Sequence, residues 1–497
     1  MASPPLSAGE IEKGPEVLVL PSITEIRNSS DISKFNNKAS INYGSVEDLS
    51  LKAKKPDAFP ETQSVVDEKQ VVVELIPDPD DDNEEEFVAA EVVFPDGGKK
   101  AWLCVVGAFC TQFCSFGWVN TFGIFQEYYL RNQLYGYSPT TVSWISTLQS
   151  SIMFMGCLIV GRLFDSYGPR YLLIVGTVLE VGGIIITSFS RNYAEILIFQ
   201  GIVAPMGAAC VFNVAVGCTS SWFKQKRARA LGIMSAGSSV GGIIYPFLIR
   251  KLAAETSFGW MMRACGFMIL ALLIVANFTI TSNVAPRGRW MPLYPKDIYI
   301  QFQDINFTLI AISFSLGFVG FTLPFTYIVS NARYHDVDDG LATYLVSILN
   351  ASSIFGRIIP AVLAERVGQY NMNSAGILLA GVSTLAIWIP ARAAGVHVLY
   401  VIFYGFFSGT FVALVPACTA KISHIQDIGT RVGLIFACLS LANLAGVPLG
   451  GVILGDGTQL SRWSGMMAFA GAFLTLGGFV SWIARIKLVG FSLRAVC

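Results

Sequence analysis

The chain has 497 residues, of which 53% are hydrophobic and only 14% are charged, and its mean hydropathy is +0.57. This composition leaves too little polar surface to coat a soluble globule of this size, so it excludes an ordinary soluble protein. The formal net charge of zero divides unequally: residues 1–98 hold 8 Lys and Arg against 21 Asp and Glu, which leaves 26 against 13 for the rest. An acidic segment therefore precedes a basic, apolar body.

Residues 1–98 contain no apolar run long enough to span a bilayer. Near their end lies the acidic block 78–86, whose self-repulsion disfavours compact structure. We expect this segment to be a disordered cytosolic tail. It has no basic segment followed by an apolar one, so we expect no cleavable signal peptide, and the first apolar helix should direct membrane insertion.

Twelve predominantly apolar stretches follow, each close to the length that a helix needs to cross a bilayer of about 30 Å. The longest break between them, from Ser282 to Asp304, separates six stretches from six. We therefore predict an all-α membrane protein with an N-terminal six-helix bundle over 99–281, a cytosolic linker over 282–304, a C-terminal bundle over 305–487 and a cytosolic tail over 488–497. The predicted spans are 101–125, 140–162, 171–190, 194–220, 230–250, 261–281, 305–330, 341–364, 373–391, 397–420, 431–454 and 465–486.

The two halves carry matching motifs at a constant offset. Gly156, Asp165 and Gly168 in the first half are answered by Gly356, Glu365 and Gly368 in the second, and Cys218-Thr219 is answered by Cys418-Thr419. An acidic residue three positions before a glycine, after matching apolar stretches, indicates an internal repeat.

Basic residues decide the expected orientation, because cytosolic loops of membrane proteins retain Lys and Arg. With the tail inside, the inner flanks of the spans collect 17 Lys and Arg and the outer flanks 7. We therefore expect a multi-pass protein with both termini in the cytosol. The plasma membrane is the expected location, with the vacuolar membrane as the alternative.

The segment Gly161-x-x-x-Asp165-x-x-Gly168-x-Arg170, between the second and third predicted helices, resembles the loop signature of the major facilitator superfamily. This resemblance implies two six-helix bundles around a central cavity.

Two further segments resemble motifs of one family within it, the monocarboxylate porters, especially their fungal branch. These are Pro95-Asp96-Gly97-Gly98 before the first helix and Trp222-Phe223-Lys224-x-x-Arg227 before the fifth. The resemblance covers about residues 95–490.

Physical chemistry gives the loop motifs a role in gating. Asp165 lies at a helix end beside a glycine, where a carboxylate can accept hydrogen bonds from free backbone amides and pair with an arginine. We expect Gly161, Asp165, Gly168 and Arg170 to form a clasp that holds the inner gate shut. Glu365 and Gly368 would form its counterpart in the second half. The alternative is that these acidic residues only cap helices and fix the topology.

Arg357, in the middle of the eighth predicted span, is the best candidate for substrate binding. A charge inside the membrane is costly and so marks a functional site by default. A guanidinium facing the cavity can hold a carboxylate through two parallel hydrogen bonds, and the resemblance places a substrate-binding or coupling arginine at this point. The alternative is a structural arginine bonded to backbone carbonyls. Glu180, the other deep charge, lies in a helix that is peripheral in the implied fold, so we expect it to have a structural partner.

The sequence departs from the lactate-type porters at two places. Those proteins have a lysine late in the first helix and an aspartate one turn before the arginine, where this chain has Gly117-Trp-Val-Asn120 and Ser353. Proton-coupled symport of a simple monocarboxylate is therefore not supported, and proton coupling stays open.

Amide side chains are the remaining polar residues on the helices that would line the cavity. Asn120, Asn213 and Asn350 are the candidates for substrate contacts, with helix–helix hydrogen bonding as the alternative role for each. They lie among many Phe and Tyr, a lining that suits a larger, partly aromatic organic solute.

Catalytic, metal and cofactor sites are not expected. The three histidines lack a second ligand at metal-binding spacing, and no phosphate-binding loop or nucleic-acid-binding motif is present. We expect a secondary transporter that moves an organic acid or larger metabolite through the lipid bilayer by alternating access, and because of Arg357 we expect this solute to be anionic. Efflux of a secondary metabolite is favoured. Uptake of a monocarboxylate or vitamin-like nutrient, and a solute receptor that does not transport, are the alternatives.

Overall fold

The computed structural model describes residues 71–77, 85–91, 94–288, 292, 294–455 and 457–490. The chain separates into two compact units, residues 1–93 and residues 94–497. In the first unit, β1 (Val71–Pro77) and β2 (Glu85–Glu91) pair antiparallel. The three consecutive valines of β1 favour an extended strand, and the sequence analysis predicted no strand here. The rest of the expected disordered tail before Phe94 lies outside the described residues, as does the end of the expected C-terminal tail.

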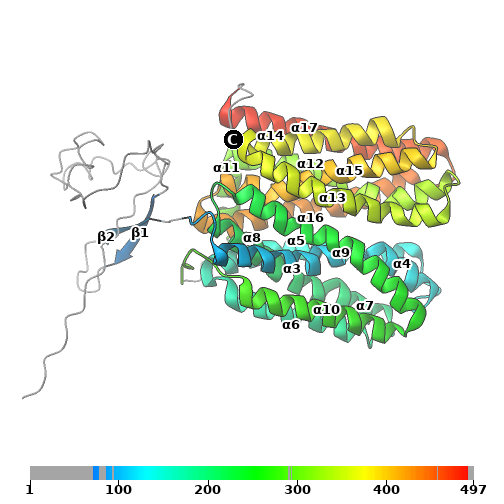
Figure 1. Cartoon of the computed structure of the whole chain (residues 1–497), viewed down its shortest axis with the longest axis horizontal. Coiled ribbons are helices and arrows are strands. Elements are labelled where there is room, and N and C mark those ends of the chain that lie inside the picture. Colours follow the sequence, from blue (N-terminus) through cyan, green and yellow to red (C-terminus); the bar gives the residue numbers. More distant parts are fainter. Residues whose placement is uncertain are drawn as a thin grey trace, which may run out of the picture. The chain divides into compact units, whose positions relative to one another are not determined.

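Six apolar spans form the first half of the second unit, and each coincides with a predicted span (Figure 1). They are α3 (Lys99–Val119), α5 (Pro139–Tyr167), α6 (Pro169–Thr187), α7 (Tyr193–Ile198) continued by the π turn η2 (Phe199–Val203) and α8 (Ala204–Trp222), α9 (Arg227–Glu255) and α10 (Phe258–Thr279). The first span ends earlier than expected, because the short helix α4 (Phe122–Arg131) follows α3 after a turn.

The second half repeats this arrangement. Its helices are α12 (Ile305–Tyr334), α13 (Asp339–Val367), α14 (Gln369–Ser383) continued by the π turn η3 (Thr384–Trp388), α15 (Ala394–Lys421), α16 (Ile428–Leu454) and α17 (Leu460–Val489). Eleven helical stretches among the described residues are long and apolar enough to cross a membrane. The predicted span 373–391 is the twelfth, and its α-helix is interrupted where α14 passes into η3. The predicted linker contains the short helix α11 (Pro295–Gln303).

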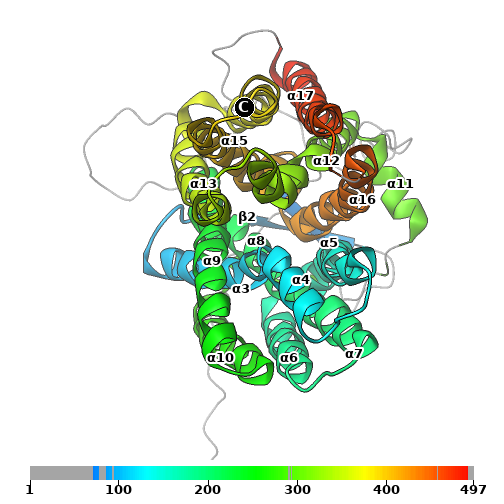
Figure 2. The same ribbon diagram turned by 90° about the vertical axis from the view of Figure 1, so that its right-hand side faces the viewer.

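The two halves meet along two pairs of helices. Helix α5 packs along α16, and α9 packs along α13. Figure 2 shows α3 to α10 gathered on one side of the bundle and α12 to α17 on the other, with these two pairs at the boundary. Helices α5 and α9 are the second and fifth spans of the first half, and α13 and α16 are the second and fifth spans of the second half. The second span of each half therefore packs against the fifth span of the other.

Glycines allow the backbones to approach closely at this boundary. A Cβ atom at Gly161 of α5 would collide with the carbonyl oxygen of Gly429 at the start of α16, and one at Gly232 of α9 would collide with the side chain of Ala361 on α13. Small residues at helix contacts are the usual means of association in a membrane, where lipid is as apolar as the helix surface.

Two adjacent glycines of α6 make a matched test of this packing. A Cβ at Gly183 would lie 2.7 Å from the backbone nitrogen of Ala204, whereas one at Gly182 would meet nothing within 4 Å. We expect Gly183→Ala to lower the free energy of unfolding by about 1–3 kcal/mol through overpacking. Gly182→Ala should be tolerated. Thermal unfolding of the purified protein in detergent, followed by tryptophan fluorescence, checks the difference, and equal midpoints for the two variants would contradict it.

Candidate functional site

Asp165, near the end of α5, binds the first turn of α16 in the opposite half. Its carboxylate accepts hydrogen bonds from the backbone nitrogen of Gly429 at 3.1 Å and from the backbone nitrogen and hydroxyl of Thr430 at 2.7 and 2.6 Å. The side chain is buried. A carboxylate is stabilised at the N-terminus of a helix, where the first amides have no partner within the helix. The predicted backbone-amide contact of Asp165 is therefore present, and it joins the two halves.

Glu365, near the end of α13, makes the second connection. Its Oε2 lies 2.6 Å from Nη2 of Arg229 on α9, and both side chains are partly exposed. The two repeat-related acids thus each reach the opposite half, Asp165 through amides and Glu365 through an ion pair. We call the end of the bundle where they lie the motif end.

The glycines that follow these acids adopt a backbone conformation that favours glycine. Gly168 has φ 77° and Gly368 has φ 100°, and each separates two consecutive helices. Arg170, the last residue of the predicted clasp, is exposed at the start of α6, and among the described residues it forms no ion pair. The connection between α10 and α12 supplies a further tie, because Arg287 pairs with Asp427 at 2.9 Å.

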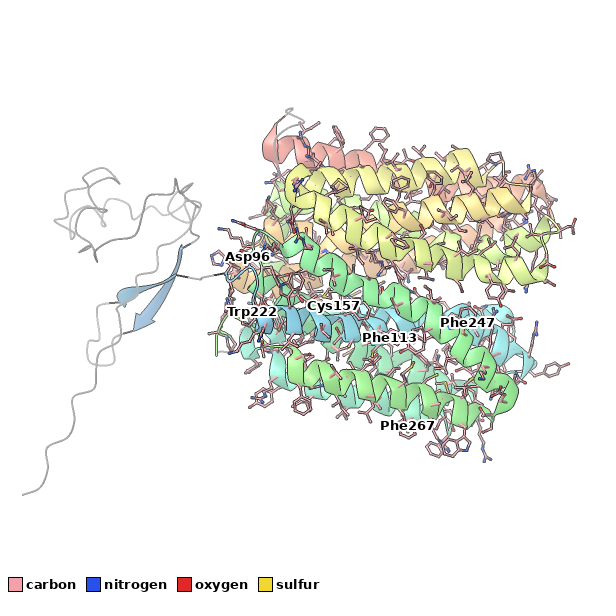
Figure 3. All side chains as sticks on the ribbon, viewed as in Figure 1. Asp96, Phe113, Cys157, Trp222, Phe247 and Phe267 are labelled. Atoms are coloured by element: carbon pink, nitrogen blue, oxygen red, sulfur yellow. The ribbon has the colours of Figure 1, made fainter. Side chains whose placement is uncertain are left out.

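The two segments that resemble monocarboxylate porters contact each other at the motif end. The carboxylate of Asp96 accepts hydrogen bonds from the backbone nitrogens of Lys224 and Lys226 at 2.8 and 3.1 Å, in the turn between α8 and α9. The backbone nitrogen of Asp96 donates to the carbonyl of Trp222. Figure 3 shows Asp96 and Trp222 at the same end of the bundle. The segment before α3 is thus anchored on the turn that leads into the boundary helix α9.

Arg357 lies at the boundary of the two halves. Its guanidinium is buried, with 4% of the residue exposed. It donates to the carbonyl of Ser235 at 2.5 Å and to the hydroxyl of Ser238, both on α9, and to the hydroxyl of Ser353 one turn before it on α13 at 3.2 Å. In this conformation Arg357 therefore joins α13 to α9 through neutral acceptors.

The three candidate asparagines are not brought together: Asn213 lies on α8, Asn350 on α13, and Asn120 in the turn after α3. Asn120 donates to the carbonyl of Ser238 at 3.4 Å, which places it near Arg357, and Asn213 donates to the carbonyl of Cys157. Asn350 donates to the carbonyl of Val346 in its own helix. The amide oxygens of Asn213 and Asn350 are buried without a hydrogen-bond partner among the described residues.

A cluster of five phenylalanines occupies the middle of the boundary, and we call it the central phenylalanine cluster. Three rings come from the first half and two from the second, with ring centroids 4.8 to 6.4 Å apart. The sequence analysis expected an aromatic lining but could not select these residues from the 35 phenylalanines of the chain. The members are Phe116, Phe154, Phe212, Phe318 and Phe436.

Glu180 on α6 has no structural partner of the kind that the sequence analysis expected. It is buried, with 1% of the residue exposed, and neither carboxylate oxygen has a hydrogen-bond partner among the described residues. It borders a small cavity between α3, α5, α6 and α8.

Residues 107–390 match the family described as Major Facilitator Superfamily. The chain is also 43% identical over 404 residues to MFS-type transporter 1 of Ophiocordyceps sp. (strain BCC 1869), a match that covers 80% of this chain and 88% of that protein. This chain belongs to the major facilitator superfamily. It is a membrane transporter and not an enzyme.

The chain is also similar to a named fungal efflux protein and to a transporter of known structure. It is 36% identical over 387 residues to the fujikurins efflux protein of Gibberella fujikuroi (strain CBS 195.34 / IMI 58289 / NRRL A-6831), covering 78% of this chain and 82% of that protein. The crystal structure of the human organic anion transporter MFSD10 (TETRAN) has a TM-score of 0.62 at 11% identity, covering 78% of this chain and 100% of that one. At this identity the second likeness shows a shared fold alone.

The contacts of Asp165 and Glu365 at the motif end should differ in how much they stabilise the closed end. We expect Asp165→Ala to open this end more than Glu365→Ala, because hydrogen bonds to a buried charged group contribute about 1.5–3 kcal/mol. A partly exposed ion pair contributes only about 0.2–1 kcal/mol. The measurement is maleimide labelling of Cys157, which is buried on α5 against Gly433 of α16.

Cys265 serves as the internal control, because it is buried on α10 away from the boundary and should react only if the protein unfolds. Labelling of Cys157 that is equal in the two variants, or greater in Glu365→Ala, would show that the ranking is wrong.

Proposed function

We propose that this transporter exports an organic secondary metabolite, anionic and with an aromatic or extended apolar body, from the cytosol across the plasma membrane. The observation that carries the proposal is the central phenylalanine cluster in a chain that is 36% identical to a protein named for fujikurins efflux. We propose further that the protein is of the monocarboxylate porter type, and the two segments that resemble those proteins, which contact each other through Asp96, support this assignment.

The proposed orientation rests on the distribution of basic residues. The motif end carries the side chains of Lys224, Lys226, Arg229 and Arg287, and cytosolic loops are the ones that retain Lys and Arg. The motif end is therefore cytosolic, and so are both termini. Asp165 and Glu365 with their partners then close the cytosolic entrance, while Gly161, Gly168 and Gly368 allow the close helix contacts and tight turns that this closure needs.

The central phenylalanine cluster provides the apolar part of the binding site. Rings from both halves contact one another in this conformation, so separation of the halves at the cytosolic end exposes ring faces from each. A solute with an aromatic or extended apolar body restores these contacts, and offset or edge-to-face ring pairs each add about 0.5–1.5 kcal/mol beyond the area that they bury. A small polar nutrient gains nothing comparable.

Arg357 provides the polar part. Its present acceptors on α9 are a carbonyl and a hydroxyl, which move away when α9 and α13 separate. A buried guanidinium without acceptors is costly, and a carboxylate of the substrate satisfies two of its N–H groups at once. Neutral hydrogen-bonding groups are also available. Asn120 donates to the carbonyl of Ser238, and the amide oxygens of Asn213 and Asn350 have no hydrogen-bond partner among the described residues. Substrate binding and release of the cytosolic closure are thereby linked.

Metabolite profiling of a strain that lacks the protein, compared with one that overproduces it, tests export directly. We expect one organic acid to accumulate inside the deletion strain and to decrease in its medium. A compound that stays unconsumed in the medium of the deletion strain would show uptake instead. No difference in either compartment would contradict transport and favour a receptor.

Two variants separate the binding role of Arg357 from its structural role. We expect Arg357→Ala to raise the half-saturating substrate concentration at least about tenfold, because loss of a charged hydrogen-bond donor costs about 1.5–3 kcal/mol. Ser238→Ala removes an acceptor of Arg357 and leaves the guanidinium in place, so it should leave this concentration nearly unchanged. Export of the compound identified by profiling, measured in membrane vesicles, gives both values. An equal effect of the two variants would show that Arg357 only joins the helices.

A further inference from the structure

The contact between α5 and α16 contains an asparagine whose amide bonds across the boundary between the halves. Nδ2 of Asn443 on α16 donates to the hydroxyl of Ser150 on α5 at 2.9 Å, and 5% of Asn443 is exposed. The hydroxyl of Ser150 itself donates within its own helix, to the carbonyls of Ser146 and Thr147 at 3.1 Å each. When the halves separate here, Ser150 keeps its own bonds, whereas the amide of Asn443 loses an acceptor.

The contact between α9 and α13 contains an asparagine at the matching level. Asn350 occupies the position in the second half that Ser150 occupies in the first, at the constant offset of the other repeat motifs. It is buried against Gly242 of α9, where a Cβ would lie 2.7 Å from Oδ1 of Asn350. That oxygen has no hydrogen-bond partner among the described residues. Each of the two contacts between the halves therefore holds one asparagine amide at this level.

These amides lie farther from the motif end than Arg357 does. Arg357 follows Asn350 by seven residues on α13, which at 1.5 Å per residue separates their levels by about 10 Å along the helix axis. The central phenylalanine cluster reaches into this interval, because Phe154 lies one turn after Ser150 on α5. From the motif end outward, the boundary thus presents a guanidinium, then aromatic rings, then two neutral amides.

A buried amide is costly at either position unless something binds it. The oxygen of Asn350 is unmatched already, and the N–H group of Asn443 becomes unmatched when the halves separate. A leucine has nearly the same shape and would carry neither cost. An amide has donors and an acceptor but no charge, so its complement in a solute is a hydroxyl, a carbonyl or another amide.

We propose that Asn350 and Asn443 bind a neutral hydrogen-bonding group at the end of the substrate opposite its acid. This inference rests on the proposed function, in which Arg357 binds the acid. The substrate is then an elongated anion whose two polar ends lie about 10 Å apart along the helix axes, with the aromatic or apolar body between them. A short monocarboxylate can occupy only one of the two polar sites. In the proposed orientation the acid faces the cytosol and the neutral end faces outward.

Three rigid probes of one shape test this site on the purified wild-type protein in detergent. The compound 4′-hydroxybiphenyl-4-carboxylate has a hydroxyl and an acid at opposite ends, biphenyl-4-carboxylate lacks the hydroxyl, and 4-hydroxybiphenyl lacks the acid. We expect the hydroxy acid to bind about three- to tenfold more tightly than biphenyl-4-carboxylate, the factor that one neutral hydrogen bond provides. Isothermal titration calorimetry gives the three Kd values.

Variants assign this preference to the two amides. Asn443→Leu and Asn350→Leu should each remove most of the preference for the hydroxy acid and leave the Kd of biphenyl-4-carboxylate nearly unchanged. Ser440→Ala is the matched control, because Ser440 makes the other side-chain bond from this part of α16 to α5, at 3.0 Å to the carbonyl of Ser151, and its loss should keep the preference. A preference that survives in both leucine variants, or that Ser440→Ala removes equally, would overturn the proposal.

The wild-type Kd values alone distinguish failure of this inference from failure of the proposed function. If the two acids bind equally and both bind more tightly than 4-hydroxybiphenyl, the neutral site is overturned and a site for aromatic anions still stands. If all three probes bind equally, or none binds, the site for an aromatic anion is overturned together with the neutral site.

Discussion

The carboxylate of Asp165 on the first amides of α16 is the interaction on which the closed bundle depends. Both groups need a partner: a buried carboxylate requires donors, and the first N–H groups of a helix have none within the helix. Each finds its partner only in the other half of the chain. Closure of the motif end therefore satisfies two requirements at once, and the contact of Gly161 with Gly429 and the tie of Arg287 to Asp427 lie around this point.

Elsewhere in the bundle, the hydrogen-bond partners of buried polar side chains also distinguish structural residues from candidate functional ones. Many buried hydroxyls bond to a carbonyl of their own helix, as those of Thr111 and Thr187 do, and these bonds do not depend on how the halves are placed. Arg357 is satisfied through atoms of the opposite half, so its environment changes with conformation. Glu180 is not satisfied by any described protein group, and it borders a small cavity.

The amino-acid sequence was sufficient for the fold, because length and apolarity determine which segments cross a membrane and a repeat at constant offset relates the halves. It was also sufficient for the kind of contact that Asp165 makes, since a carboxylate at a helix end beside a glycine has few alternatives. It could not identify Thr430 as the partner, because the two residues are 265 positions apart and no local pattern relates them. Likewise, only tertiary packing leaves Glu180 without a hydrogen-bond donor among the described residues and brings together the five rings of the central phenylalanine cluster.

The unequal burial of the two acidic ties has a consequence for the way in which the bundle responds to ionic strength. The bonds of Asp165 are buried and are little screened by dissolved ions, whereas Arg229 and Glu365 are 34% and 18% exposed and attract each other partly through water. Concentrated salt should therefore weaken the tie between α9 and α13 through Arg229 and Glu365 more than it weakens the contact of Asp165 with α16.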